Sequence, residues 1–285
     1  MSFNKAMIVY CSPGGTTRHV AGVMMQQCQS LEIEVQEVDL ARRPDMGDIM
    51  DKIAYATEDL CLFIGSPVYV SHAVPPVMDF IAQLPEGTDL PVVPFVTWGG
   101  ACSGMALFEM GTALEAKGMV PVGAAKLLAV HSMLWRSENP VGQGHPDAED
   151  DRLVSDLVRH VHDQLSCGNK AAVATADLAH YPAPVRAEMA KMNLKIAAAH
   201  MPAREVDAAA CTECGQCAEV CPTDAITFAP TPVFGETCIY CYTCVRECPE
   251  DATKTALSPA ETRIRERVKQ FDEQPLSQIF YVSET

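Results

Sequence analysis

Two short cysteine-rich segments constrain this chain more than any other feature. The first cysteine segment, CTECGQCAEVCP, begins at Cys211, and the second cysteine segment, CIYCYTCVRECP, begins at Cys238. Each has the spacing C-x2-C-x2-C-x3-C followed by proline, and together they hold eight of the chain's 13 cysteines. Thiolates are soft ligands that favour iron–sulfur clusters or zinc. Three cysteines this close together crowd one tetrahedral zinc site, whereas a cubane cluster has well-separated iron corners. We therefore predict iron–sulfur clusters.

In this spacing, and in Pro222 and Pro249, residues 205–257 resemble the bacterial two-cluster ferredoxin module. The resemblance implies a small α+β domain in which the last cysteine of each segment binds the cluster of the other segment. One 4Fe–4S cluster would then be bound by Cys211, Cys214, Cys217 and Cys248. The second 4Fe–4S cluster would be bound by Cys238, Cys241, Cys244 and Cys221.

Upstream of these segments, apolar stretches suited to buried strands alternate with stretches of helical periodicity. The predicted strands are residues 5–11, 31–40, 59–69, 91–100 and 121–132. The predicted helices are a first one after the glycines at 14 and 15, then 75–84, 103–118 and 145–165. Such alternation implies a parallel sheet with right-handed crossovers. Five strands fit the doubly wound α/β order 2-1-3-4-5.

The composition along the chain predicts four parts. Residues 1–166 would form the α/β domain, and residues 167–204, rich in alanine, a helical linker. Residues 205–257 would form the cluster domain. Residues 258–285 would form a C-terminal helix and tail whose many charges face solvent.

The stretch SPGGTTRHVA connects the first predicted strand to the first helix. Backbone N–H groups at such a helix N-terminus bind phosphate, and Ser12, Thr16 and Thr17 add hydroxyl donors. No lysine follows in a GxxxxGK[ST] pattern, and there is no GxGxxG. A loop with neutral donors suits a monophosphate such as that of FMN.

This loop resembles the phosphate loop of the flavodoxins, although Gly14 stands where those proteins commonly have threonine. Loops 66–76 and 98–104 match two further flavodoxin loops, which enclose the isoalloxazine ring. The resemblance implies a flavodoxin-like domain with these FMN-binding residues: Ser12, Gly14, Gly15, Thr16, Thr17, Pro67, Val68, Tyr69, Trp98, Gly99 and Gly100. Tyr69 and Trp98 are candidates for stacking on the flavin, with ordinary packing as the alternative for each.

Residues 131–150, after the fifth predicted strand, are rich in glycine and proline. A long loop at the carboxyl end of a parallel sheet commonly lies over the ligand site. Met133 or Trp135 could cover the flavin, or the loop could contact the cluster domain. His72 could lie at the flavin edge, although a lone histidine is more often structural.

As a whole, the chain resembles the flavodoxin–ferredoxin fusions found mainly in anaerobes. The resemblance implies an electron-transfer protein with one FMN and two 4Fe–4S clusters. It would couple one-electron and two-electron redox partners, such as a ferredoxin or an oxidoreductase. The alternative is an FMN-dependent reductase of a small molecule that receives electrons from the clusters.

The net charge of −16 argues against nucleic acid or an anionic membrane as a partner. It fits either solubility or docking onto a basic redox protein. Clustered cysteines, with no signal peptide or membrane span predicted, favour a cytoplasmic protein. A homodimer with one chain's cluster beside the other chain's flavin stays open. Because loops 66–76 and 98–104 contain no lysine or arginine and the chain is strongly acidic, we expect a low flavin reduction potential.

Overall fold

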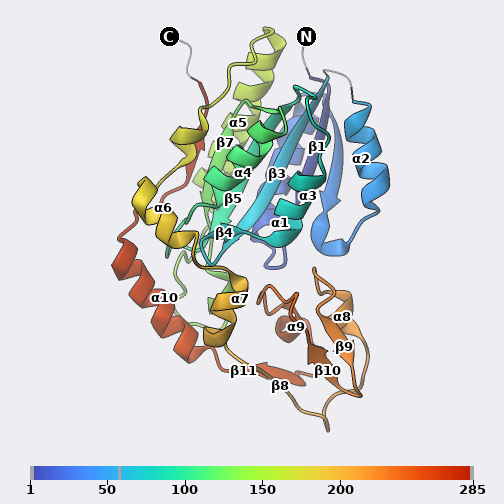
Figure 1. The fold of residues 1–285 in the computed structure, drawn as a ribbon, viewed down its shortest axis with the longest axis vertical. Helices are drawn as coiled ribbons and strands as arrows, with labels where there is room; N and C mark the ends of the chain where they lie inside the picture. Colours follow the sequence, from blue (N-terminus) through green and yellow to red (C-terminus); the bar gives the residue numbers. More distant parts are fainter. Residues whose placement is uncertain (1–2, 57–58, 283–285) are drawn as a thin grey trace.

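The main sheet has the strand order β2-β1-β3-β5-β7-β12. The computed structural model describes residues 3–56 and 59–282 (Figure 1). The five parallel strands are β1 (Lys5–Tyr10), β2 (Glu34–Asp39), β3 (Leu60–Tyr69), β5 (Pro91–Trp98) and β7 (Ala124–Leu128). Taken in chain order, these strands have the predicted arrangement 2-1-3-4-5, which is confirmed.

Helices cover both faces of the sheet, which explains why β3 and β5 are apolar along most of their length. One face packs against α1 (Thr16–Ser30) and α5 (Ala148–Ser166). The other face packs against α2 (Met46–Ala54), α3 (Pro75–Gln83) and α4 (Ala106–Ala116). Parallel strands place all their carboxyl ends at one edge of the sheet, so the loops that follow β1, β3 and β5 lie together there.

The sheet also contains strands that the sequence patterns missed. The short β4 (His72–Ala73) pairs antiparallel with β3, and β6 (Val120–Pro121) pairs parallel with β5. At the far edge, β12 (Gln278–Phe280) runs antiparallel to β7. The C-terminal residues predicted as a tail therefore complete the sheet of the first domain.

The linker folds into α6 (Ala183–Met189) and α7 (Leu194–Ala197), and α10 (Ser258–Phe271) follows the cluster domain. Figure 1 shows the cluster domain beyond the lower end of the sheet, with α7 and α10 beside it. No helix of the described residues is long and apolar enough to cross a membrane.

The cluster domain is a small α+β unit, as predicted. Its strands form two antiparallel pairs, β8 (Arg204–Val206) with β11 (Thr253–Thr255) and β9 (Ile226–Phe228) with β10 (Pro232–Phe234). Each cysteine segment has one short helix that contains its third cysteine, α8 (Gln216–Glu219) and α9 (Thr243–Arg246). Both helices begin after a left-handed residue, Gly215 at φ 81° and Tyr242 at φ 57°. The two cysteine segments therefore share a backbone shape as well as a spacing.

Candidate cofactor sites

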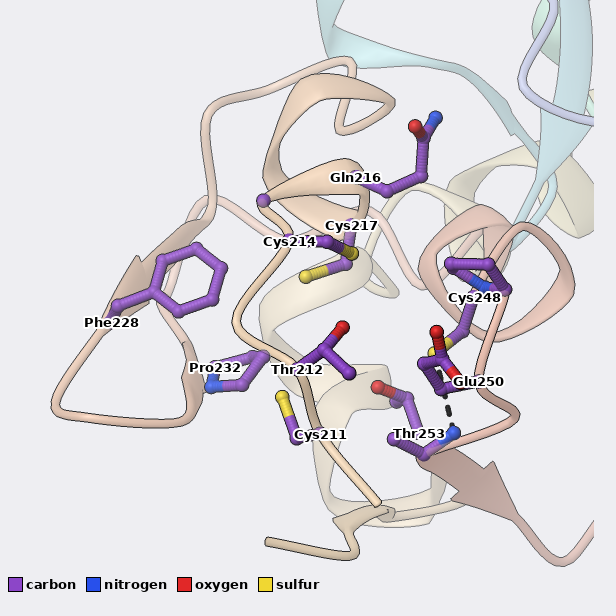
Figure 2. Close-up of a pocket in the computed structure, with 13 residues that line it drawn as sticks. Cys211, Thr212, Cys214, Gln216, Cys217, Phe228, Pro232, Cys248, Glu250 and Thr253 are labelled. Carbon is purple, nitrogen blue, oxygen red and sulfur yellow. Dashed lines mark hydrogen bonds between the residues drawn. The ribbon is translucent and has the colours of Figure 1, made fainter. Parts of the chain in front are cut away.

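The first cysteine site joins three cysteines of the first segment to the last cysteine of the second. One small pocket is lined by Cys211, Cys214, Cys217 and Cys248 (Figure 2). The Ala252 N–H donates to the Cys248 sulfur at 3.3 Å. Cys214 is exposed, and Cys217 is buried. This site therefore lies close to the protein surface.

The second cysteine site has the reciprocal composition and is more enclosed. Its pocket is lined by Cys221, Cys238, Cys241 and Cys244, and all four are buried. The Ala225 N–H donates to the Cys221 sulfur at 3.2 Å. The Thr243 hydroxyl oxygen lies 3.3 Å from the Cys241 sulfur. The structure thus brings together the same two groups of four cysteines that the ferredoxin resemblance implies.

A guanidinium group lies directly against the second cysteine site. Arg204 donates from Nη1 to the Cys238 sulfur at 2.8 Å. Its guanidinium also lies over the rings of Phe234, Tyr240 and Tyr242, at 4.1, 5.4 and 5.8 Å from their centroids. A positive charge and hydrogen bonds at the sulfurs are two ways in which a protein stabilises an added electron on a cluster.

A larger cavity, the central cavity, has a volume of about 560 Å³. Cofactor and small-molecule sites typically measure about 300–1,000 Å³. The first domain contributes residues 14, 16, 17, 67–71, 97–99 and 129–133 to its walls. The rest of the lining comes from residues 239 and 240, from several residues between 185 and 201, and from several between 260 and 271.

Eight of the predicted FMN-binding residues line the central cavity: Gly14, Thr16, Thr17, Pro67, Val68, Tyr69, Trp98 and Gly99. The other three, Ser12, Gly15 and Gly100, lie outside this lining. The Ser12 hydroxyl accepts from the Arg18 N–H at 2.8 Å and so holds the start of α1. Gly15 precedes α1 with φ 91°, a conformation that favours glycine. Gly100 lies against the 131–150 loop, because a Cβ there would be 2.9 Å from a Val141 methyl carbon.

The donor groups of the central cavity fit a flavin mononucleotide. Ser12 accepts from the Arg18 N–H of α1, and the N–H groups of Thr16 and Thr17 at the start of that helix suit a phosphate. The Tyr69 hydroxyl and the Trp98 indole N–H are buried, and neither has a hydrogen-bond partner in the described part of the chain. A polar ligand in the cavity would satisfy such groups.

The two stacking candidates differ in their surroundings. Trp98 is only 1% exposed, and Lys126 Nζ lies 5.2 Å from the centroid of its ring. Tyr69 is partly exposed at the cavity. Tyr69 is therefore better placed to stack on a flavin, and Trp98 packs mainly as a core residue.

The second cysteine segment reaches the flavin loops directly. Ile239 and Tyr240, between two of its cysteines, line the central cavity. The carbonyl of Pro13, in the phosphate loop, accepts hydrogen bonds from the Thr243 hydroxyl and from Arg246 Nη2, each at 2.9 Å. The second cysteine site and the central cavity are therefore neighbours within one chain.

The 131–150 loop lines the central cavity with its first residues and contacts the cluster domain with a later one. Met133 lines the central cavity. Trp135 turns to the cluster domain, where its ring centroid lies 6.3 Å from that of Tyr242 and 5.3 Å from the Arg246 guanidinium carbon. The loop thus connects the cavity wall to the second cysteine site.

Helices α6, α7 and α10 form one side of the cavity, which we call the roof. Most charged side chains of α10 face solvent, as the charge run predicts, but one side of the helix faces the cavity. Arg263, Ile264 and Arg267 all line the cavity. The 66–76 loop contains no lysine or arginine of its own, but α10 brings an arginine to it, because Arg267 Nη2 donates to the Ser71 hydroxyl at 3.2 Å. The spacing of Ala260, Ile264, Arg267 and Phe271 was the signal that marks this inward face.

A buried ion pair fixes the end of α10 to the sheet. The Glu273 carboxylate accepts from Lys126 Nζ at 2.8 Å, from the Ser103 N–H at 2.7 Å and from the Tyr181 hydroxyl at 2.6 Å. Burial by itself raises the pKa of Glu273, but these hydrogen bonds outweigh it and hold the pKa below its usual value. The network joins the linker, the 98–104 loop and the C-terminal segment, none of which adjoin in sequence.

His72 is a structural residue and does not line the cavity. Its Nδ1 lies 2.9 Å from Glu109, and its Nε2 lies 2.9 Å from the Met192 carbonyl and 3.2 Å from the Met189 carbonyl. The hydrogen bond to Glu109 is the main reason that the pKa of His72 is raised. With acceptors at both nitrogens, a protonated His72 connects α4 to the roof.

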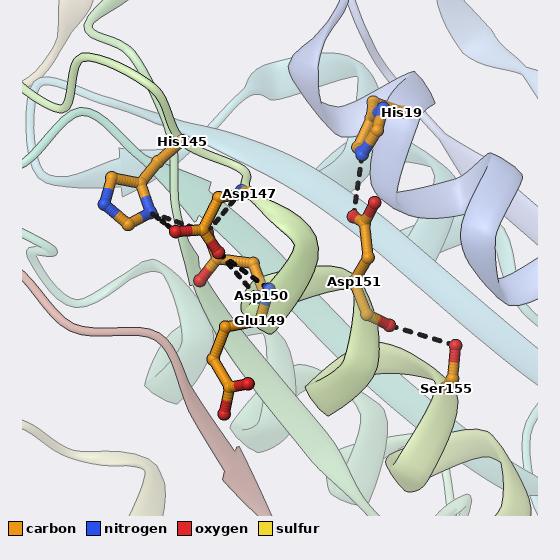
Figure 3. A network of polar contacts seen from close by, with 7 residues as sticks. All are labelled: His19, His145, Asp147, Glu149, Asp150, Asp151 and Ser155. Atoms are coloured by element: carbon orange, nitrogen blue, oxygen red, sulfur yellow. Dashed lines mark hydrogen bonds and ion pairs between the residues drawn. The ribbon is translucent and has the colours of Figure 1, made fainter.

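A cluster of His145, Asp147 and Asp150 stands at the start of α5 (Figure 3). Asp147 and Asp150 form a capping box, in which each side chain accepts from the backbone N–H of the other. His145 Nδ1 lies 2.6 Å from Asp150. These contacts account for the cluster as a helix cap.

The family model of the 4Fe–4S binding domain matches residues 204–227, which contain the first cysteine segment. No curated protein matches the chain.

Among solved structures, the chain is similar to the rubredoxin oxygen:oxidoreductase of the anaerobe Desulfovibrio gigas, with 17% identity and a TM-score of 0.45. It is also similar to a flavodoxin from the domain Archaea (20%, 0.41) and to flavodoxin 1 from Bacillus cereus (14%, 0.43). The similarity to the rubredoxin oxygen:oxidoreductase covers 57% of this chain and 36% of that chain. For the archaeal flavodoxin these shares are 57% and 99%, and for flavodoxin 1 they are 55% and 96%. The chain thus spans about a third of the length of the rubredoxin oxygen:oxidoreductase. Its strand order and its iron–sulfur motif define a flavodoxin-like domain joined to a 4Fe–4S domain.

Proposed function

We propose that this protein transfers electrons between two 4Fe–4S clusters and one FMN within a single chain. The observation that carries the proposal is the contact between the second cysteine segment and the flavin loops. Ile239 and Tyr240 line the cavity that Thr16 and Tyr69 also line. A cluster at the second cysteine site would therefore be adjacent to a flavin in the cavity.

Each cluster exchanges one electron, whereas a bound flavin exchanges one or two. The protein's part is to hold these groups and to set the charge around them. The eight cysteines would bind the clusters, and the start of α1 would bind the flavin phosphate. Arg204 would favour the reduced form of the second cluster through its contact with Cys238.

The exposure of the two cysteine sites supports an order of transfer. Cys214 is exposed, and Glu213 and Glu250 beside the first site are exposed acids. An external redox protein with a basic face would exchange electrons there. The buried second site would connect the first cluster to the flavin. This route requires no second copy of the chain.

The same arrangement bears on the flavin potential. The expected low potential depended on loops without basic residues. Arg267 contacts Ser71 in one of those loops, and Arg246 contacts Pro13 in the phosphate loop. Both charges would favour the reduced, anionic flavin, and they oppose the effect of the chain's overall negative charge.

An FMN-dependent reductase is the second candidate. The observation that favours it is the roof, because a carrier needs no enclosed space beyond the flavin. The cavity wall formed by the linker and α10 would enclose a small acceptor near the flavin.

The test uses the full chain, reconstituted anaerobically with FMN, iron and sulfide. Bound flavin and iron are counted, and the clusters are then reduced by a light flash. We expect one FMN, two cluster signals and a cluster-to-flavin transfer rate that does not change with protein concentration. A rate that rises with concentration would mean transfer between molecules. A protein that binds no flavin would make the first domain a docking domain.

A further inference from the structure

The mouth of the central cavity has a chemistry of its own, separate from the flavin loops. Its outer part is formed by the roof. Met192, His200, Arg263 and Gln270 line the cavity and are exposed to solvent, whereas Met189 is buried. A small molecule that enters the cavity would therefore pass these side chains.

The two arginines of α10 lie one helical turn apart on its inward face. Arg267 donates to the Ser71 hydroxyl, and its guanidinium carbon lies 4.9 Å from the Phe271 ring centroid. Arg263 donates to the His200 carbonyl. Among the described residues, neither guanidinium forms an ion pair with a carboxylate.

The cavity lining also contains an acidic residue, which is paired with a lysine. Glu188 lines the mouth, but its carboxylate lies 2.6 Å from Lys191 Nζ. The side chains that line the mouth therefore have a net positive charge, although the chain as a whole carries a net charge of −16. A positive site on an acidic protein selects anionic ligands by local contacts and not by long-range attraction.

The remaining lining is apolar. Met189, Met192, Ile264 and Phe271 line the cavity beside the arginines. Methionine side chains adapt to the shape of a ligand, and their sulfur atoms pack well against aromatic rings. A compound bound here would thus have an anionic end and an apolar body.

We propose that the cavity mouth binds a small organic carboxylate, with its carboxylate on Arg267 and Arg263 and its apolar body on the methionines. The proposal rests on the proposed function, because it gives the ligand class of the flavin site. Guanidinium groups bind carboxylates through paired N–H donors, and Arg267 keeps free donors beyond its single hydrogen bond to Ser71. The flavin phosphate has separate donors at α1 and therefore does not need these arginines.

The probe is benzoate, with benzamide as its uncharged counterpart. Benzoate is titrated into the FMN-loaded, cluster-loaded full chain, and binding is followed by the flavin absorbance spectrum and by calorimetry. We expect saturable binding of benzoate and much weaker binding of benzamide. Absence of benzoate binding in protein that holds FMN would overturn the proposal while leaving the proposed function intact.

Substitutions locate the site. Arg267→Gln should weaken benzoate binding about tenfold or more, as expected for the loss of a charged hydrogen-bond pair. Arg267→Lys should restore part of the affinity. Lys269→Gln is the matched control, because Lys269 is exposed on the same helix and does not line the cavity. Equal affinities of the Arg267→Gln and Lys269→Gln variants would overturn the proposal.

FMN content separates this role from flavin binding. Each variant is denatured and its released FMN is counted. We expect Arg267→Gln to retain FMN at the wild-type ratio. If that variant loses FMN, the arginine serves the flavin and the proposal fails. If wild-type protein itself takes up no FMN, the proposed function fails, and calorimetry with benzoate still reports whether the carboxylate site exists.

Discussion

The first and second cysteine segments hold their ligands at the same spacing, yet the residues between the ligands differ. Thr212 in the first corresponds to Ile239 in the second, and Glu213 corresponds to Tyr240. Thr212 and Glu213 are exposed, whereas Ile239 is buried at the central cavity. The cysteines thus specify the kind of cofactor. The residues between them decide which copy packs against the flavin loops and which stays at the surface.

The residue two positions after the third cysteine also differs between the two segments. Glu219 in the first segment corresponds to Arg246 in the second. Arg246 donates to the Pro13 carbonyl of the phosphate loop. Glu219 is exposed. Substitutions at corresponding positions of the two segments can therefore test whether their roles are distinct.

The largest effect is expected from removing one ligand in each segment. Cys241→Ser should leave only the cluster far from the cavity, and electron exchange with the flavin should become nearly undetectable. Cys214→Ser should leave the adjacent cluster, which should still exchange electrons rapidly with the flavin. Flash reduction followed by visible and EPR spectroscopy measures both. Equal transfer rates in the two variants would contradict the proposed order.

Loss of the clusters should also be unequal. Cys214 is exposed, whereas all four cysteines of the second site are buried. In air, we expect the first cluster to be lost several-fold faster than the second, because oxidants and chelators reach it more easily. The decay of the two EPR signals, followed after reduction of timed samples, measures this. Simultaneous loss would mean that the two sites open together.

The next effect concerns the reduction potential of the second cluster. Arg204→Gln removes a positive charge from contact with Cys238. We expect this cluster's potential to fall by roughly 60 mV, which for one electron corresponds to a tenfold change in equilibrium constant. The first cluster should keep its potential. Arg204→Lys, which retains the charge, is the control, and an EPR-monitored redox titration gives both potentials.

The smallest effect is expected at the contact with the phosphate loop. Arg246→Gln removes a charged donor from the Pro13 carbonyl, a hydrogen bond worth roughly 1.5–3 kcal/mol. The dissociation constant of FMN should rise by only about threefold, because the loop loses part of its support and keeps its other contacts. Glu219→Gln, at the corresponding position of the first segment, should leave it unchanged. Fluorescence titration with FMN measures both. An equal change in the two variants would remove the distinction between the segments.

Much of the architecture was predictable because its signals are local. Alternating strands and helices predicted the parallel sheet and its order, and the glycine loop marked the edge where the cavity lies. Eight of eleven FMN-binding candidates line that cavity. The three exceptions, Ser12, Gly15 and Gly100, shape the loops by capping, by backbone conformation and by close packing.

Other features depend on contacts between distant parts of the chain. Nothing near Lys126 in sequence indicates that Glu273 will be its buried partner. The charges of α10 suggested a solvated helix, since charge alone does not show which face of a helix is covered.

The sequence by itself determined the cysteine spacing, the alternation of strands and helices, and the glycine-rich connection between β1 and α1, because each depends on residues only a few positions apart. The tertiary structure decided which cysteine site adjoins the central cavity and placed the arginines of α10 in its wall. It also added β12 to the sheet. These outcomes depend on which apolar surfaces cover one another across more than a hundred residues, and short-range patterns carry no information about that choice.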